Sequence, residues 1–223
     1  MANIAIYVND PYCSWDSASG FVDAMDHFHQ CSYINDINLI DLQQYHMVVF
    51  PGGIGDADSF DWLLADKANL ISHYVMNGGM YLGICMGAYW AGPSYFDLID
   101  SLDTVQYIKQ PNALVKRSYG TVVPVTWENN TEFMYFYDGC TFEGDTSNVQ
   151  VVGQYGSGHP AAIIQENNYS KKYAKKVGKV GLIGPHLEST EYWYNTWSYM
   201  PDYWHQGKHH QLLRKFVNEM LTQ

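Results

Sequence analysis

The feature that most constrains the fold of this chain is an apolar segment that ends on a cysteine between two glycines. Residues 80–84 are apolar, Cys85 follows them directly, and Gly83 and Gly87 lie two residues before and after it. This spacing is typical of a nucleophile elbow, a sharp turn from a buried strand into a helix, where glycine lets the two backbones approach closely. The pattern predicts that Cys85 lies strained and exposed at the carboxyl edge of a sheet.

The residue type at the turn predicts its chemistry. A cysteine at a helix N-terminus lies beside the positive end of the helix dipole and beside unpaired N–H groups, and both favour the nucleophilic thiolate over the thiol. The competing interpretation is structural, because cysteine is often buried as a small hydrophobic residue and so short a motif also occurs in packed cores.

Strand and helix patterns alternate along the first half of the chain. Strand patterns cover residues 3–8, 33–39, 48–50 and 80–84, and helical spacing covers residues 17–30 and 59–76. The second helical segment is expected to bury Trp62, Leu63, Leu70, Ile71, Tyr74 and Val75. Such alternation predicts an α/β protein with a mostly parallel sheet covered on both faces and with ligands at the carboxyl ends of its strands.

The second half of the chain is richer in β-structure. Short strand patterns at residues 121–127, 132–137, 149–154 and 161–165 predict antiparallel strands or hairpins, an antiparallel β-rich insertion in the parallel sheet. The chain then returns to the main sheet at residues 180–183 and closes with a helix at residues 206–221. We find no repeat or linker and expect one domain over residues 1–223.

A histidine and a glutamate follow the last predicted strand. His186 and Glu188 are two residues apart, so in an extended chain their side chains would share a face. An imidazole with an orienting carboxylate is the pair that a thiol nucleophile needs as its base. In isolation, the same letters also fit a solvated turn.

A Pro-Gly-Gly sequence ends another strand pattern, at residues 51–53. Glycines there free the N–H groups of Gly52 and Gly53 to face a site, and the N–H of Met86, directly after the cysteine, would supply a further donor to an oxyanion. The competing interpretation is a plain turn after a strand.

These segments, in this order, resemble the class I glutamine amidotransferase superfamily. Within it, the chain is most similar to the N-terminal domain of eukaryotic biotin-protein ligases and its stand-alone relatives. The narrower resemblance rests on residues 4–14, 78–91, 136–142 and 178–186. It implies a three-layer, doubly wound, flavodoxin-like sheet. Nothing in the chain resembles the Gly-Arg-Gly-Arg loop of the ligase catalytic domain, so biotin ligation is not expected.

The resemblance also implies roles for single residues. Cys85 would be the nucleophile, His186 the base and Glu188 its orienter. Amides of Gly52, Gly53 and Met86 would form the oxyanion hole, and Tyr89, Tyr137 and Asp138 would contact substrate. Glutaminases of the superfamily usually carry His-Gln or Gln-Gln where this chain has Ala88 and Tyr89, which disfavours glutamine as the substrate.

Two hypotheses follow for function. The first is a cysteine-dependent amidohydrolase or amidotransferase with a Cys-His-Glu triad, acting on a small-molecule or peptide amide. The second is a catalytically silent module that keeps the scaffold and binds a small ligand or a protein partner.

The composition of the chain argues against two classes of binding partner. A net charge of −11 and a pI near 5.0 argue against nucleic acid and anionic membranes as partners. Four cysteines, no charged leader before an apolar core and no run of about eighteen apolar residues lead us to expect a cytoplasmic protein with free thiols. A homodimer is compatible with the sequence.

Two further clusters invite interpretation. Nine histidines include His205, His209 and His210, but no matching cysteine or carboxylate pattern accompanies them. We therefore expect exposed or capping histidines, no metal and no cofactor. The aromatic segment 191–204 fits either a wall of the site or, as we favour, packing of the last helix or a subunit contact.

Overall fold

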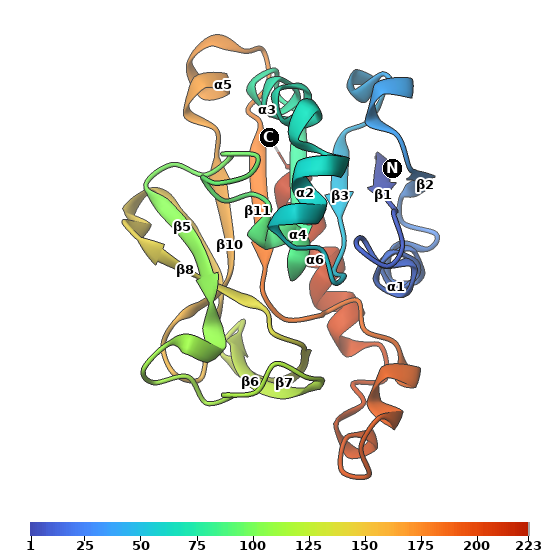
Figure 1. Cartoon of the computed structure of the whole chain (residues 1–223), viewed down its shortest axis with the longest axis vertical. Helices are drawn as coiled ribbons and strands as arrows, with labels where there is room; N and C mark the ends of the chain where they lie inside the picture. The colour runs from blue at the N-terminus through green and yellow to red at the C-terminus, as the bar shows by residue number, and fades with distance from the viewer. Residues whose placement is uncertain (223) are drawn as a thin grey trace.

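The computed structural model describes residues 1–222, and its main element is a nine-stranded mixed sheet (Figure 1). In spatial order the strands are β2 (Gln30–Ile34), β1 (Asn3–Tyr7), β3 (Met47–Phe50), β4 (Met80–Ile84), β11 (Lys179–Ile183), β10 (Pro160–Glu166), β9 (Gln150–Tyr155), β6 (Thr121–Trp127) and β7 (Asn130–Phe136). The first five are parallel to one another, and the remaining four continue the sheet in antiparallel pairs. The expected α/β fold class is confirmed.

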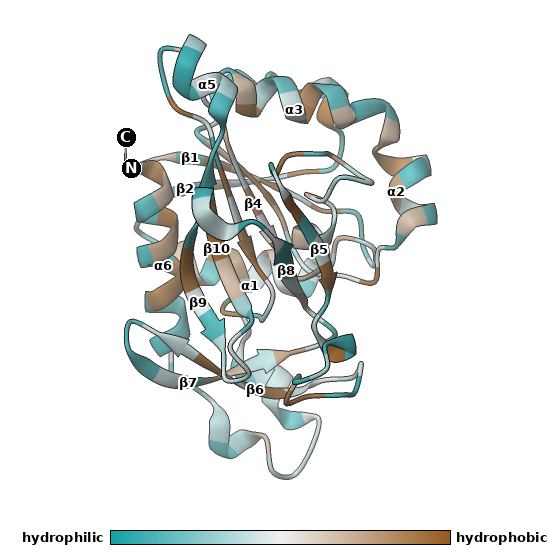
Figure 2. Ribbon diagram, turned by 90° about the vertical axis from the view of Figure 1, so that its left-hand side faces the viewer, coloured by the Kyte–Doolittle hydropathy of each residue, from teal (hydrophilic) through white to brown (hydrophobic). Residues whose placement is uncertain are grey.

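Helices cover both faces of the parallel half. They are α1 (Trp15–Met25), α2 (Ala57–Leu63), α3 (Ala68–Met76), α4 (Met86–Tyr89), α5 (Asn168–Tyr173) and α6 (Lys208–Leu221). Because successive side chains of a strand point to opposite faces, Ile4 and Ile6 pack with α1 and α6, whereas Ala5 and Tyr7 pack with α2 and α3. Figure 2 shows α6 on one side of the sheet and α2 and α3 on the other.

The antiparallel strands do not form a separate unit. β10 pairs with β11 along its length, so the β-rich segment extends the parallel sheet rather than standing beside it. A small second sheet, β5 (Leu102–Gln106) with β8 (Cys140–Gly144), was not predicted; β5 precedes the antiparallel strands in sequence, and β8 lies between β7 and β9.

The helix predicted for residues 59–76 is broken. Leu64 leaves the helical region (φ −136°, ψ −11°), a single 3₁₀ turn follows, and α3 then restarts at Ala68. The break changes which residues face the core: Phe60 and Leu64 are buried, whereas Trp62 is 62% exposed and Leu70 is 43% exposed. The expectation that Trp62 and Leu70 are buried is therefore wrong.

Other boundaries shift less. α1 begins at Trp15, earlier than predicted, because the Ser14 hydroxyl accepts hydrogen bonds from the N–H groups of Asp16 and Ser17. The second strand ends at Ile34, and residues 37–39 form a 3₁₀ turn capped by Asp36. None of the helices within residues 1–222 combines the length and the hydrophobicity needed to span a bilayer.

Candidate active site

Four neighbouring parallel strands end at the same edge of the sheet, and the loops that follow them meet there. The segments that follow β1, β3, β4 and β11 carry Ser17 (in the first turn of α1), Gly53, Cys85 and His186, respectively. The pairing of β4 with β11 is in register up to Ile84 and Ile183, and the Cys85 N–H donates to the Ile183 carbonyl at 2.8 Å. Cys85 and the residues after β11 are thereby brought side by side.

The chain turns sharply at Cys85, between the end of β4 and the start of α4. Its φ of 50° lies in the left-handed region that a residue with a side chain rarely adopts. A Cβ at Gly83 would lie 2.4 Å from the Gly87 carbonyl oxygen, and one at Gly87 would lie 2.0 Å from that of Phe50. Only glycine fits at either position, so the turn has the geometry of a nucleophile elbow.

The Cys85 side chain is less accessible than predicted. It is 6% exposed, because the loop after β7 covers it. The thiol donates a hydrogen bond to the Tyr137 carbonyl oxygen, with an Sγ–O distance of 3.4 Å. The opening to solvent is therefore set by that loop and not by the strand edge alone.

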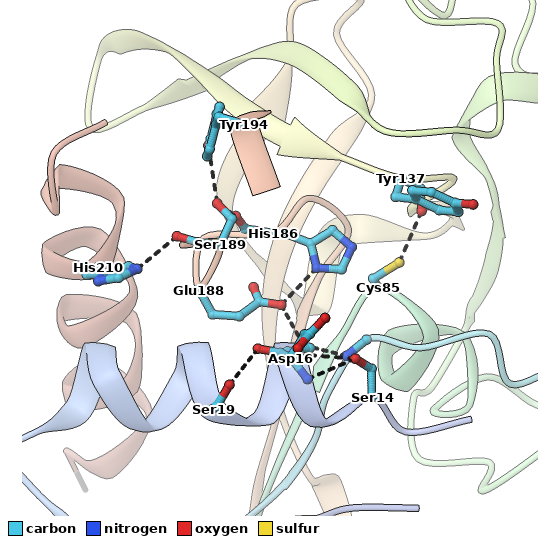
Figure 3. A network of polar contacts seen from close by, with 12 residues as sticks. Ser14, Asp16, Ser19, Cys85, Tyr137, His186, Glu188, Ser189, Tyr194 and His210 are labelled. Atoms are coloured by element: carbon cyan, nitrogen blue, oxygen red, sulfur yellow. Dashed lines mark hydrogen bonds and ion pairs between the residues drawn. The ribbon is translucent and has the colours of Figure 1, made fainter. Parts of the chain in front are cut away.

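His186 and Glu188 form a buried pair beside the cysteine (Figure 3). The His186 Nδ1 donates to the Glu188 Oε1 at 2.8 Å, and the Glu188 side chain is fully buried. The contact is made across a turn, since the Ser189 N–H bonds back to the His186 carbonyl, and not along an extended strand as predicted. Backbone pairing with Tyr135 holds His186 in place.

The environment of His186 favours the charged imidazolium. Burial acts to lower the pKa of the ring, but the Glu188 carboxylate and, next, the neighbouring Cys85 outweigh it and raise the pKa of His186 to about 10. The ring is also packed edge-to-face against Tyr135 and Trp193, at centroid distances of 5.9 and 5.2 Å.

Ser17 is a member of this network that the sequence analysis did not identify. Its hydroxyl donates to the Glu188 Oε1 at 2.6 Å and accepts from the Gly52 N–H at 2.9 Å. Ser17 lies in the first turn of α1, so the carboxylate also lies near the positive end of that helix. The separation of 171 residues between Ser17 and Glu188 left no local signal in the sequence.

The predicted oxyanion donors differ in their availability. The Gly52 N–H is bound to Ser17, so the oxyanion role expected for Gly52 does not fit this arrangement. A Cβ on Gly52 would lie 2.6 Å from the His186 Cε1, which explains the glycine by close packing of the ring. The N–H groups of Gly53 and Met86 have no hydrogen-bond partner within residues 1–222 and remain candidates.

Only one of the three expected substrate-contact residues lines the cavity. Tyr137 lines the cavity at Cys85, with its side chain 48% exposed. Tyr89 and Asp138 are not among the lining residues: the Tyr89 hydroxyl donates to the Asp138 carbonyl at 3.1 Å, and the Asp138 Oδ2 accepts from Gln106. Both shape the turn that carries Tyr137, which does not support direct contact with substrate.

A cavity of about 500 Å³ opens at Cys85 and His186. Part of its wall comes from the aromatic segment after Glu188, because Tyr192 and Trp193 line it. Tyr194 points the other way and is fully buried against Tyr135 and Met200. The packing interpretation favoured for this segment holds for Tyr194, and the alternative, a wall of the site, describes Tyr192 and Trp193.

Comparison with known proteins agrees with this fold. A family described as "Biotin-protein ligase, N terminal" matches residues 41–99. A glutamine amidotransferase from Thermotoga maritima is similar in structure over 100% of this chain and 99% of its own, with a TM-score of 0.67 and 12% identity. A second solved structure, also titled a glutamine amidotransferase, covers 98% of both chains with a TM-score of 0.64 and 14% identity. The chain has the glutamine amidotransferase-like fold.

The matched family segment contains the Pro-Gly-Gly turn and the Cys85 elbow of this glutamine amidotransferase-like fold, but it ends before His186. An uncharacterized protein of Chlamydia muridarum is 30% identical over 164 residues. That match spans 64% of this chain and 60% of the relative, so the chain covers about three fifths of the length of the curated relative it matches.

The histidine cluster near the C-terminus contacts the backbone directly after Glu188. His205 and His210 each donate from Nε2 to the Ser189 carbonyl, at 3.1 and 3.0 Å, directly after Glu188. His205 also accepts from the Gly207 N–H at the start of α6, which is the capping role that was expected. Burial and the nearby His209 lower the pKa of His205 to about 3. No group of side chains within residues 1–222 has the arrangement of a metal site.

Proposed function

We propose that the protein is a cysteine-dependent amidohydrolase or amidotransferase in which Cys85, His186 and Glu188 act as a triad. The observation that carries the proposal is the buried His186–Glu188 pair, with an Nδ1–Oε1 distance of 2.8 Å, in the same cavity as a cysteine at a strained strand-to-helix turn. A buried imidazolium and carboxylate beside a thiol are a costly arrangement for packing alone, and they suit nucleophilic catalysis.

The reaction proceeds in two halves. The Cys85 thiolate attacks the amide carbon and forms a C–S bond, while the carbonyl oxygen becomes an anion held by the N–H groups of Gly53 and Met86. The C–N bond then breaks, the His186 Nε2 gives its proton to the leaving nitrogen, and a thioester remains on the enzyme. Water, or the nucleophile of a partner substrate, then attacks the thioester and gives a proton to His186 as the C–S bond breaks.

Glu188 and Ser17 orient the base in this scheme. Glu188 fixes the tautomer and the direction of the imidazole and stabilises the imidazolium. Ser17 holds the carboxylate from α1. Ala88 and Tyr89 stand at the two positions after the elbow where glutaminases of the superfamily usually carry His-Gln or Gln-Gln, so we propose an amide other than glutamine as the substrate.

Competitive alkylation tests the proposal. With limiting iodoacetamide at neutral pH, mass spectrometry should find Cys85 modified about tenfold or more faster than added N-acetylcysteine, a thiol of ordinary pKa, and faster still than Cys31. Cys31 is the matched control because it is half-buried and burial raises its pKa to about 11. Burial also raises the pKa of Cys13 and of Cys140, so these two thiols should stay unmodified. Equal rates at Cys85 and Cys31 would contradict the proposal.

One observation favours the second candidate, a silent binding module. The Cys85 thiol donates to the Tyr137 carbonyl, a contact that a resting thiol makes and a thiolate cannot. If the module interpretation holds, a folded Cys85→Ala protein keeps its cellular activity; loss of that activity supports the enzyme.

A further inference from the structure

Apart from His186, which is paired with Glu188, the charged side chains that line the cavity are all negative. Asp10, in the loop after β1, and Asp16, in the first turn of α1, both line the cavity. No lysine or arginine is among its lining residues within the described chain. Neither aspartate has an ion-pair partner in residues 1–222.

Local hydrogen bonds account for only one of the four oxygens of these two carboxylates. The Asp10 Oδ1 accepts from the Trp15 N–H at 2.9 Å, which uses one of its two oxygens. Asp16 lies at a helix N-terminus, where a negative charge is favourable, but its carboxylate makes no hydrogen bond to a described residue. Oxygens of both residues remain free to meet a ligand.

Aromatic rings supply another part of the wall. Tyr192, Trp193, Tyr135 and Tyr137 line the cavity, from β7, the turn after it and the segment after Glu188. Tyr192 is 77% exposed, more than a ring held by packing would be. The faces of such rings attract ammonium and guanidinium groups, and the attraction grows where water is excluded.

The His186–Glu188 pair does not offset this negative potential. It carries one positive and one negative charge in direct contact, and Glu188 is not itself among the residues that line the cavity. The uncompensated charge around Cys85 is therefore that of the two aspartates. An anionic acyl donor would approach these carboxylates without a counter-ion from the protein.

We infer that the substrates of this cavity are amides that carry a cationic group, an ammonium or a guanidinium, held between the Asp10 and Asp16 carboxylates and the aromatic wall. The inference rests on the proposed function, because it assigns the substrate class of the same nucleophile. It does not depend on which half of the amide carries the cation.

A pair of thiol reagents of opposite charge tests the inference. The probes are the methanethiosulfonates that carry a trimethylammonioethyl or a sulfonatoethyl group; in each, the Cys85 thiolate forms a disulfide with the reagent and releases methanesulfinate. Rates at Cys85 are measured by mass spectrometry and divided by those of 2-mercaptoethanol. We expect the cationic reagent to be favoured about tenfold or more at low salt, since a cleft of one charge sign raises local concentration by that order.

Charge-neutral variants locate the effect. Asp10→Asn and Asp16→Asn keep the shape of the side chain, and each should reduce the preference by about threefold. Asp58→Asn is the matched control, because Asp58 is exposed, occupies in α2 the position that Asp16 occupies in α1, and is not among the residues that line the cavity. Its preference should equal that of the wild-type protein.

The outcomes separate the two claims. A fast reaction at Cys85 with no preference for the cation, or with a preference that survives both aspartate substitutions, overturns the inference and leaves the proposed function standing. A Cys85 that reacts with both probes no faster than Cys31 overturns the proposed function and the inference together. Protection of Cys85 from iodoacetamide by choline, but not by uncharged 3,3-dimethyl-1-butanol, supports the inference through binding alone.

Discussion

A single hydroxyl joins a helix to two loops of the site. Ser17 of α1 is 1% exposed, and its Oγ contacts the Glu188 carboxylate after β11 and the Gly52 N–H after β3. The Glu188 Oε2 is buried without a partner among the described residues, so the carboxylate has few other contacts to lose. Interactions of a buried charge are costly to break, because a group left without its partner keeps its desolvation penalty.

Removal of the Ser17 hydroxyl should therefore destabilise the protein. We expect Ser17→Ala to lower the free energy of unfolding by about 1–3 kcal/mol, since it removes a hydrogen bond from the buried Glu188 carboxylate and leaves the Gly52 N–H unsatisfied. Urea denaturation measures the change. Ser19→Ala is the control on the same helix: its hydroxyl bonds only to the Asp16 carbonyl, and its substitution should change stability by less than about 0.5 kcal/mol. Similar losses in both variants would contradict the role of Ser17.

The raised pKa of His186 predicts a dependence of stability on pH. Its pKa lies near 6.5 in an unfolded chain and at about 10 in the folded protein. The stabilisation from the imidazolium is thus complete below pH 6.5 and is lost as the pH rises towards 10. We expect the stability advantage of the wild-type protein over His186→Gln to shrink between pH 6.5 and pH 9.5 in urea titrations. An advantage that stays constant over this range would mean that the ring is neutral in the folded protein.

At the scale of elements, the elbow depends on three backbones in contact. Gly87 at the start of α4 lies against the Phe50 carbonyl of β3, and Gly83 of β4 lies against Gly87 itself. The same contact positions Cys85 and the Met86 N–H. A change in the packing of α4 onto the sheet would therefore also change the geometry of the site.

A methyl group at the elbow should not be tolerated. Gly87→Ala places a Cβ 2.0 Å from the Phe50 carbonyl oxygen and should cost about 3 kcal/mol, the upper end for an overpacked site. Gly158→Ala is the matched control, because nothing lies within 4 Å of its Cβ and only its φ of 93° is unfavourable; about 1–2 kcal/mol is expected there. Thermal or urea unfolding of both variants compares the two, and equal costs would refute close contact at the elbow.

Sequence patterns predicted the elements that carry strong local signals. The elbow, the strand β11 and the closing helix have periodic apolar residues or glycine spacing that short-range physics explains. The break at Leu64 carried no glycine or proline, and it follows from tertiary packing of Phe60 and Leu64 instead. Contacts between distant segments depend on the order of the strands in the sheet, which local sequence patterns do not encode. Examples are the contacts of Ser17 with Glu188 and of Gly52 with the His186 ring.

Over the whole molecule, the C-terminal segment closes the site between the two halves of the sheet. Tyr194 is anchored against Tyr135 of the antiparallel half, and its hydroxyl contacts Ser189 beside Glu188. Trp193, the residue before it, packs on His186 and lines the cavity. One face of this short segment stabilises the fold, and the other forms a wall of the site.

Neighbouring tyrosines should therefore behave differently. Tyr194→Ala removes a fully buried ring and should cost about 3–5 kcal/mol of stability. Tyr192→Ala changes an exposed ring and should leave stability within about 0.5 kcal/mol, while it alters the reactivity of Cys85 towards the cationic probe. Urea unfolding and probe kinetics on both proteins separate the roles. A large loss of stability in Tyr192→Ala would show that this ring, too, serves packing.

The activation of Cys85 by the buried pair is tested most directly by its alkylation rate in variants of that pair. We would measure the second-order rate of iodoacetamide with Cys85 at neutral pH in the wild-type protein, His186→Gln and Glu188→Gln, with circular dichroism as the check on folding. Loss of the adjacent positive charge should slow the reaction by about tenfold or more in His186→Gln, with a smaller decrease in Glu188→Gln. Unchanged rates in two folded variants would contradict a triad at this site.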